Sequence, residues 1–476
     1  MGLFDKLRGG SEDRVVFLGI DGVPHELVED HPDIFENLHA IAEAGSGGRI
    51  ESIVPPESSA CWPSLTTGQN PGQTGVYGFQ DRERGSYETY VPMGSHVEAA
   101  RIWDLVTEDG RDATVLNVPV TFPPTSRIQR QVSGFLSPSI EKASSDDELR
   151  RTLDRYDYAI DADAKLGHEA DKTDFIENAH ATLEARRDVF RHYVDEDDWD
   201  LFFGVFMTSD RVNHFLFGDY ATDGEYAEDF LEFYRELDAA IGDIRERLDD
   251  DTELVVASDH GFTRLEYEVD LNRWLEEQGW LAYEGDSGEG DSDQSGGSSG
   301  GGENDADEDA NAPDSLAGIA DDARAYSLIP GRLYLNLEGR EPRGSVPEDD
   351  YEAVREELIA DLEELEGPDG RSVCKRIVPG EEAFEGDHTE IAPDLVVIPA
   401  DGFDLKASFG SDKEVFSEGP RNGMHKFENA CLYTTDPDVE IGDDVNLFDI
   451  APTILDQLDV DADHSSLDGD SLVVSE

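Results

Sequence analysis

Three apolar segments of the sequence, each typical of a buried strand, are followed at their carboxyl ends by residues that could bind a metal ion. These residues are Asp21 after residues 15–20, Asp210 after residues 201–207, and Asp259 with His260 after residues 254–257. Clustered carboxylates repel one another and raise one another's pKa unless a cation lies between them. A single Asp at a strand end is more often a helix cap, but three such ends favour a metal site.

Histidines accompany two of the three strand ends. His214 lies four positions after Asp210, and His260 directly follows Asp259. A mixed set of aspartates and histidines suits Zn²⁺, Mn²⁺ or a similar divalent ion. The residue types therefore predict that divalent metal binds where these strands end.

A pair of serines could supply a nucleophile. Ser58 and Ser59 follow a Pro-Pro turn and stand where a short helix through Leu65 is expected to begin. Backbone N–H groups and the helix dipole at such a position favour an anion and lower the cost of an alkoxide. A serine that only caps the helix fits these residues equally well, so at this point both serines and both roles stay open.

Apolar strands alternate with amphipathic helices over the first half of the sequence, which is typical of a doubly wound α/β domain. The carboxyl ends of the strands in an open parallel sheet line the ligand crevice, so the strand-end aspartates would meet at one edge. We predict a mostly parallel central sheet flanked by helices, with a helical cap and a smaller inserted α+β subdomain.

The expected organisation follows composition and periodicity along the chain. Its parts are a flexible N-terminus at 1–12, a catalytic domain formed by 13–262 and 383–476 with a helical cap at about 140–200, an inserted subdomain at 263–382, and within it an acidic loop at 284–314. The loop is dominated by Gly, Ser, Asp and Glu, a composition that predicts disorder. The strand expected at 395–398 is assigned to the catalytic domain.

The chain of 476 residues has 111 acidic and 37 basic residues and a formal net charge of −74. This excess repels nucleic-acid backbones and anionic membranes, so neither is expected as a partner. It fits a halophilic protein, because molar salt shortens the screening length to about 3 Å, with an ordinary acidic cytosolic protein as the alternative. Three cysteines without CxxC spacing, together with the lack of a long apolar stretch and of a signal-peptide core, predict a cytoplasmic location.

Several short motifs, taken in order, resemble the alkaline phosphatase superfamily and, within it, the type I phosphodiesterase/nucleotide pyrophosphatase branch. The motifs are Asp21, Pro55-Pro-Glu-Ser58 with Thr67-Gly68 and Asn70-Pro-Gly72, Asp210 with His214, Ser258-Asp-His-Gly261, and Gly423-Met-His425. The likeness covers nearly the whole chain except the acidic loop. Its specificity lies in the ordered combination of motifs, since none of them is decisive alone.

The resemblance implies a hydrolase that cleaves phosphodiester or nucleotide pyrophosphate bonds of a small phosphate ester through a covalent serine intermediate. It selects Ser58 rather than Ser59, because the family's hydroxyl lies ten residues before the glycine matched by Gly68. It also implies two divalent metal ions, with Zn²⁺ preferred and Mn²⁺ as the other candidate. One ion would be surrounded by Asp21, Ser58, Asp259 and His260, and the other by Asp210, His214 and His425.

The sequence departs from the family at two positions near the expected site. Thr74 stands where the family often has His before a glycine, and Cys61 replaces an Asn that helps to bind phosphate in nucleotide pyrophosphatases. The second departure leaves nucleotide preference open. Phosphomonoesterase, phosphonate hydrolase, sulfatase and phosphomutase activities remain alternatives, although Leu65 replaces the Arg that closes the sulfatase signature. Outside enzymes, the alternative is a metal-binding module with a dead site.

Overall fold

A seven-stranded sheet forms the centre of the computed structural model, which describes residues 13–283, 316–409 and 414–474. Its strand order is β2 (Ser46–Ile50), β17 (Ala430–Thr434), β8 (Thr252–Ala257), β1 (Arg14–Ile20), β7 (Leu201–Phe206), β5 (Ala113–Val118) and β6 (Arg130–Ser133). Strands β8, β1, β7, β5 and β6 are parallel, and β17 is antiparallel to both of its neighbours. The predicted mostly parallel, doubly wound sheet is confirmed.

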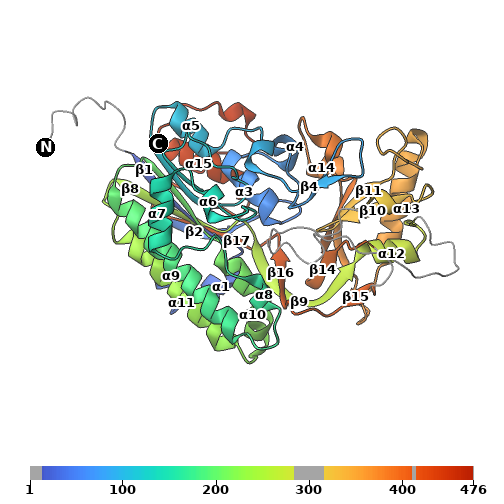
Figure 1. Cartoon of the computed structure of the whole chain (residues 1–476), viewed down its shortest axis with the longest axis horizontal. Helices are drawn as coiled ribbons and strands as arrows, with labels where there is room; N and C mark the ends of the chain where they lie inside the picture. Colours follow the sequence, from blue (N-terminus) through green and yellow to red (C-terminus); the bar gives the residue numbers. More distant parts are fainter. Residues whose placement is uncertain (1–12, 284–315, 410–413, 475–476) are drawn as a thin grey trace.

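Helices cover both faces of this sheet (Figure 1). Along β1, Val16 and Leu18 pack into one core layer, and Val15 and Phe17 pack into the other. A strand that is apolar on both faces has to be covered on both. One face is covered by α1 (His25–Asp30), α2 (Glu36–Ala44), α7 (Asp147–Arg155), α9 (Thr173–Glu196), α10 (Thr208–Thr222) and α11 (Ala227–Arg245), and the other by α3 (Ser58–Thr67), α5 (Ile102–Glu108) and α15 (Ile450–Gln457).

The segment predicted to form a helical cap, at about 140–200, is helical. Besides α7 and α9 it contains α6 (Ile140–Ala143) and α8 (Ala164–Gly167). Helix α9 buries Phe175, Val189 and Phe190 in the core layer shared with β7 and α11, so it is an integral part of one helical layer of the sheet.

A second, smaller group of strands has its own core. Its sheet has the antiparallel order β10 (Ala325–Leu328), β11 (Arg332–Leu335), β13 (Leu395–Pro399), β12 (Cys374–Pro379), and it packs with α12 (Leu271–Glu277) and α13 (Tyr351–Glu363). Sequence analysis placed the strand at 395–398 in the catalytic domain, whereas β13 is hydrogen-bonded between β11 and β12. An apolar run of this length fits either sheet, and only pairing decides between them.

One long strand connects the two groups. Strand β9 (Gly261–Asp270) leaves the central sheet directly after His260 and pairs first with β16 (Gly423–Lys426), then with β14 (Gly402–Lys406) and β15 (Phe416–Ser417). In Figure 1 it runs from beside α10 toward α12. The predicted flexible N-terminus and all of the predicted acidic loop at 284–314 lie outside the described residues.

Buried ion pairs join the smaller group of strands to a separate two-stranded hairpin. Asp81 and Arg82 form β3 (Asp81–Arg82), which pairs with β4 (Thr89–Tyr90). Arg332 donates to Asp81 at 2.5 Å, and Arg82 donates to Glu341 at 2.8 Å. All four side chains are almost completely buried, so each charge depends on its partner. We call these residues, together with the neighbouring pair Arg340 and Asp394, the joint cluster.

Candidate metal centre

Three parallel strands bring the three predicted aspartates to one edge of the sheet. Strand β1 lies between β7 and β8, with Ile20 beside Phe206 and Gly19 beside Ala257. Asp21 directly follows β1, Asp210 lies in the first turn of α10 after β7, and Asp259 follows β8. The carboxyl ends of the strands are therefore level, and all three carboxylates are buried there.

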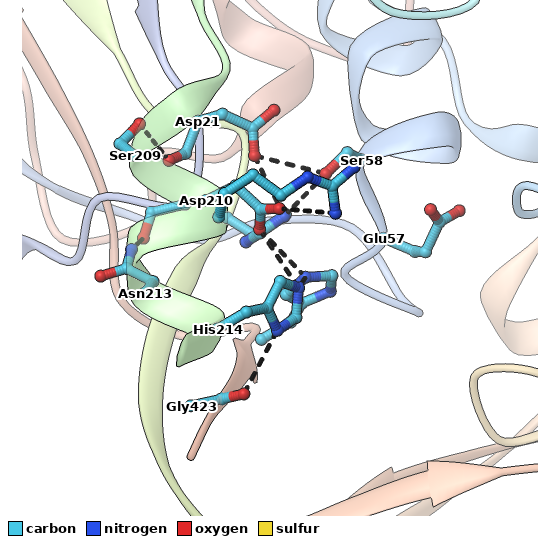
Figure 2. Close-up of polar contacts among 12 residues, drawn as sticks. Asp21, Glu57, Ser58, Ser209, Asp210, Asn213, His214 and Gly423 are labelled. Carbon is cyan, nitrogen blue, oxygen red and sulfur yellow. Dashed lines mark hydrogen bonds and ion pairs between the residues drawn. The ribbon is translucent and has the colours of Figure 1, made fainter. Parts of the chain in front are cut away.

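Ser58 is the first residue of α3 and faces this edge (Figure 2). Its Oγ lies 3.3 Å from Asp21 Oδ1 and 3.1 Å from His260 Nε2. The neighbouring Ser59 turns away, because its hydroxyl and its backbone N–H both donate to Glu57 Oε1. The geometry therefore separates the two serines that the sequence pattern alone left equivalent.

The imidazoles complete two overlapping groups of ligand atoms. Asp21, Asp210 and His260 form one group, and Asp210, His214 and His425 form the other. Within each group the ligand atoms all lie within 4.8 Å of one another. In the second group, Asp210 Oδ1 lies close to both histidines, 3.5 Å from His214 Nε2 and 3.3 Å from His425 Nε2.

Asp259 belongs to the same cluster. Its Oδ2 lies 3.5 Å from His260 Nε2, and its Oδ1 accepts the backbone N–H of Gly22 at 3.2 Å. All seven residues that the sequence singled out are therefore brought together. The ring centroids of His260 and His425 are 4.0 Å apart, although His425 comes from β16, far along the chain from His260.

The three carboxylates repel one another, and this repulsion shifts their pKa values. Burial, together with the charges of Asp259 and Asp210, raises the pKa of Asp21 well above its usual range. Burial and the charge of Asp210 raise the pKa of Asp259 to about 7. Burial would also raise the pKa of Asp210, but the charges of His214, His425 and Arg211 outweigh it and lower that pKa. Three carboxylates thus compete for too little positive charge.

Two buried carboxylate oxygen atoms indicate what this edge of the sheet could bind. Among the described residues, neither Asp210 Oδ1 nor Asp259 Oδ2 has a hydrogen-bond partner. An unpaired buried carboxylate oxygen is costly, and a coordinated cation removes that cost. Carboxylate oxygens and imidazole nitrogens are also the donor atoms that Zn²⁺ and Mn²⁺ accept. The residues present therefore fit divalent metal.

Backbone and side-chain contacts behind the ligands hold them in place. His214 Nδ1 lies 3.3 Å from Gly423 O, and His260 Nδ1 lies 3.1 Å from Gly261 O. A protonated Nδ1 that donates to a carbonyl leaves Nε2 as the coordinating atom. The indole N–H of Trp62 donates to Asp21 Oδ2 at 2.6 Å, so the other oxygen of Asp21 faces Ser58.

A pocket opens from this edge toward the smaller group of strands. Ser58, Asp210, His214 and His425 line it on one side, and Ile329, Pro330 and Leu405 line it on the other. Cys61 is not among the described residues that line this pocket, because it is fully buried with its Sγ 3.4 Å from Ser52 Oγ. Thr74 is likewise buried, in α4 (Pro71–Thr74).

Sequence reasoning did not select several side chains that shape this site. Arg211, Lys406 and Arg421 line the pocket, and Trp62 orients Asp21. Arg211 follows a predicted ligand and could have been found from that position. Lys406 and Arg421 carry no comparable signal, because an isolated basic residue is usually on the surface.

Comparisons with known proteins agree with this architecture. Residues 15–427 match the family model of type I phosphodiesterases/nucleotide pyrophosphatases. No curated protein sequence matches the chain. Phosphonoacetate hydrolase from Sinorhizobium meliloti 1021, in complex with phosphonoacetate, has a similar structure with a TM-score of 0.56 and 14% identity, over 95% of this chain and 97% of that chain.

Two mammalian structures also have a similar fold. Murine ectonucleotide pyrophosphatase/phosphodiesterase 5 in complex with AMP has a TM-score of 0.54 and 12% identity, over 94% of this chain and 96% of that one. Its human counterpart has a TM-score of 0.54 and 11% identity over the same shares. At such identities these likenesses establish the fold. No helix among the described residues is both long enough and apolar enough to span a membrane.

Proposed function

Because the chain belongs to the type I phosphodiesterase/nucleotide pyrophosphatase family, whose members hydrolyse phosphoric esters, we propose that it cleaves phosphodiester or pyrophosphate bonds of small molecules through Ser58. One observation carries the proposal. The Ser58 hydroxyl lies within 3.3 Å of Asp21 and 3.1 Å of His260, beside two overlapping Asp/His groups that share Asp210. A hydroxyl and a divalent-metal ligand set in this arrangement suit phosphoryl transfer.

We assign the ligands as the resemblance implies. Asp21, Ser58, Asp259 and His260 would hold one divalent ion, and Asp210, His214 and His425 the other, with Zn²⁺ or Mn²⁺ as the candidates. When bound, the two ions would supply positive charge that lowers the pKa of the serine hydroxyl and neutralises the phosphoryl oxygens.

The chain's own residues then have defined tasks in a double displacement. The Ser58 hydroxyl loses its proton, and its Oγ forms a bond to phosphorus while the bond from phosphorus to the leaving oxygen breaks, which gives a phosphoryl-serine and a leaving group that takes up a proton from solvent. Water next loses a proton and forms a bond to the same phosphorus as the bond to Ser58 Oγ breaks, and Oγ takes up a proton, which restores the serine. Asp21 and His260 hold the hydroxyl in line for the first step, because both are within hydrogen-bonding range of Oγ.

We assign contact with the phosphoryl oxygens to Arg211. The Asn that serves this purpose in nucleotide pyrophosphatases is replaced by Cys61, which is buried away from the pocket. Arg211 lines the pocket with Ser58, and its Nη1 lies 3.7 Å from Asp210 Oδ2. Asp161 accepts from its Nε at 2.8 Å, and the ring of Phe135 lies 5.0 Å from its guanidinium carbon, so the group is fixed in direction. A fixed guanidinium suits phosphate recognition.

The test is a pair of serine variants assayed with bis(4-nitrophenyl) phosphate in molar KCl, with Zn²⁺ or Mn²⁺ supplied. Ser58→Ala is expected to lose at least about 10³-fold in kcat while still binding metal. Ser59→Ala is the matched control and should remain active, because its hydroxyl bonds to Glu57 rather than facing the ligands. Full activity in Ser58→Ala would remove this serine from its assigned role.

A substrate panel separates the alternatives. Comparing bis-aryl phosphate, aryl phosphate and aryl sulfate by kcat/KM would distinguish a diesterase from a monoesterase or a sulfatase. The sulfatase alternative has little support, because the cysteine that would need modification, Cys61, is enclosed in the core. Metal content without hydrolysis of any of these esters would instead indicate a catalytically dead module.

A further inference from the structure

Helix α10 carries two neighbouring pairs of polar side chains at the candidate metal centre. Asp210 and His214, four positions apart, belong to one group of ligand atoms. Ser209 and Asn213, also four positions apart, contact the turn that follows β1. Residues four apart lie on the same face of a helix, so the two pairs form adjacent stripes. The stripe of Ser209 and Asn213 has no task in the function proposed above.

Ser209 and Asn213 bind both carbonyl groups of the turn at residues 21–22 (Figure 2). Ser209 Oγ donates to Asp21 O at 2.7 Å, with Phe206 O further away at 3.0 Å, and Asn213 Nδ2 donates to Gly22 O at 2.7 Å. Both side chains are fully buried, so water does not compete for these hydrogen bonds. The turn needs glycine at its second position, where φ is +70°.

The same turn contacts a ligand that follows strand β8. The peptide between Asp21 and Gly22 accepts from Ser209 through its carbonyl. Its N–H donates to Asp259 Oδ1 at 3.2 Å. A peptide unit is planar and rigid, so a shift of the carbonyl moves the N–H as well. Helix α10 thereby fixes Asp21 and Asp259 in position relative to its own ligand, Asp210.

Tyr234 on α11 determines which way the Asn213 amide faces. Its hydroxyl donates to Asn213 Oδ1 at 2.7 Å, and its side chain is fully buried. Because the amide oxygen accepts from Tyr234, the amide nitrogen is directed to Gly22 O. Buried side chains from two helices therefore hold this one turn.

The other explanation for these contacts is general, because a buried carbonyl needs a donor wherever it lies. Asn272 in α12 has such a purpose in the smaller group of strands. Its Nδ2 donates to Ser327 O at 3.1 Å, and its Oδ1 accepts from Ser327 N at 2.7 Å. Asn272 and Asn213 are both fully buried, but Asn213 holds a turn that carries a metal-ligand candidate. This difference allows the two explanations to be separated.

We propose that Ser209 and Asn213 are positioning residues that set the spacing between the two metal sites, by fixing the turn at residues 21–22 against α10. The inference rests on the two-ion assignment of the proposed function and goes beyond it, because neither side chain is itself assigned as a ligand. The ion assigned to Asp21 should depend on these contacts, whereas the ion assigned to His214 should not. Loss of a group that orients metal ligands typically lowers metal affinity by about 10–100-fold.

Metal titration of the folded protein in molar KCl tests the proposal. Dissociation constants are measured for Zn²⁺ by competition with a chelator and for Mn²⁺ from the electron paramagnetic resonance signal of the free ion. The spectrum of the Mn²⁺-loaded protein also reports the magnetic coupling between neighbouring ions. Ser209→Ala and Asn213→Ala should each weaken one of the two ions by about tenfold or more and alter the coupling, while the other ion keeps its affinity. Tyr234→Phe should act in the same direction more weakly, because the amide is kept and loses only the group that orients it.

Asn272→Ala is the matched control, since it removes an equally buried amide that also binds backbone. It should lower Tm, while both dissociation constants and the magnetic coupling stay at wild-type values. Circular dichroism shows which variants are folded. Ser209→Ala and Tyr234→Phe each delete a single hydroxyl, and they decide the question if Asn213→Ala does not fold.

Two results would overturn the proposal. One is wild-type affinity and coupling in the folded Ser209 and Asn213 variants, and the other is an equal loss of affinity in Asn272→Ala. Failure of the proposed function looks different. A wild-type protein that binds two coupled ions and hydrolyses no ester in the panel would lose that function and leave the positioning role in place. A wild-type protein that binds fewer than two ions of either metal would end both.

Discussion

The protein buries two clusters of charged side chains, and they differ in how the charges are balanced. In the joint cluster, Arg332 pairs with Asp81, Arg82 with Glu341 and Arg340 with Asp394, all within 2.8 Å. At the metal centre, Asp21, Asp210 and Asp259 face one another and three imidazoles, and two of their oxygens have no hydrogen-bond partner among the described residues. Each carboxylate of the joint cluster lies within 2.8 Å of an arginine, whereas the carboxylates of the candidate metal centre lie close to one another and fit a cation.

Buried charges in the joint cluster therefore serve structure, and those in the candidate metal centre serve function. Paired charges recover by mutual attraction part of what they lose in leaving water, so the joint cluster fixes the smaller group of strands against the β3–β4 hairpin. Unpaired carboxylates with raised pKa values destabilise the free protein and stabilise its complex with a cation. Loss of one charge should therefore act mainly on metal binding and activity in one cluster and mainly on stability in the other.

The largest expected effect follows from Asp210→Asn, because this carboxylate belongs to both ligand groups. The substitution should lower kcat/KM for bis(4-nitrophenyl) phosphate by at least about 10³-fold, since it removes several kcal/mol of charge stabilisation of the transition state. Metal bound per folded chain should fall as well, because both ligand groups lose the carboxylate that they share. Activity and metal content near wild-type values would contradict the comparison.

Arg332→Met is expected to act on stability instead. It leaves Asp81 buried without its partner and should lower the free energy of unfolding by about 3–5 kcal/mol, measured by denaturant titration in molar KCl. Bound metal per folded chain should not change. Adding Asp81→Leu should recover part of the loss, because no isolated charge then remains. A single variant as stable as the wild type would show that the joint cluster does not stabilise the fold.

Metal should stabilise the wild type and Arg332→Met by the same amount. At a free-ion concentration about 100 times the dissociation constant, the gain is about 2.7 kcal/mol per site, seen as a rise in Tm. Asp210→Asn should show a much smaller rise. If metal stabilised Arg332→Met far less than the wild type, the two clusters would not be independent.

The smallest effect, counted per pH unit, concerns the stability of the metal-free protein. Burial and the charge of Asp210 raise the pKa of Asp259 to about 7, so the folded state keeps a proton that the unfolded chain loses near pH 4. This contribution to stability is complete below about pH 4 and is lost as the pH rises toward 7, by at most about 1.4 kcal/mol per pH unit.

Asp259→Asn should remove this contribution, so it is measured as the difference between wild-type and variant stability over pH 4–7 at constant salt. The variant should gain on the wild type as the pH rises. Metal at saturation should abolish the slope, because the ions take the place of the proton. A constant difference across this range would contradict the assigned repulsion.

The sequence predicted the metal centre better than the joint cluster, for a physical reason. Parallel strands bring their carboxyl ends to one edge, so Asp21, Asp210 and Asp259 could be placed together from strand pattern alone. His425 lies on β16 and reaches the site only through pairing with β9, so it was found by resemblance to a family. Neither Arg82 nor Arg332 was predicted to be buried in an ion pair, since an arginine is usually exposed.

Two further features could not be predicted from local sequence because they depend on tertiary packing: which serine faces the ligands, and which sheet β13 joins. The position of Ser58 and Ser59 at a helix start was predictable, but which hydroxyl faces the ligands depends on how α3 packs under Trp62 and beside Glu57. Strand β13 was predicted as a strand and given the wrong neighbours, because its buried apolar residues would suit either sheet. Hydrophobic periodicity in the sequence identifies a strand, but hydrogen-bond pairing decides which sheet the strand joins.

The most direct test of the account is a crystal structure of the protein with Zn²⁺ or Mn²⁺, in which anomalous scattering locates the ions. We predict two peaks about 3.5–4 Å apart, one held by Asp210, His214 and His425 and the other by Asp21, Asp259 and His260 next to Ser58 Oγ. A single peak, or ions bound away from these side chains, would contradict the claim that this edge of the sheet is a two-metal centre.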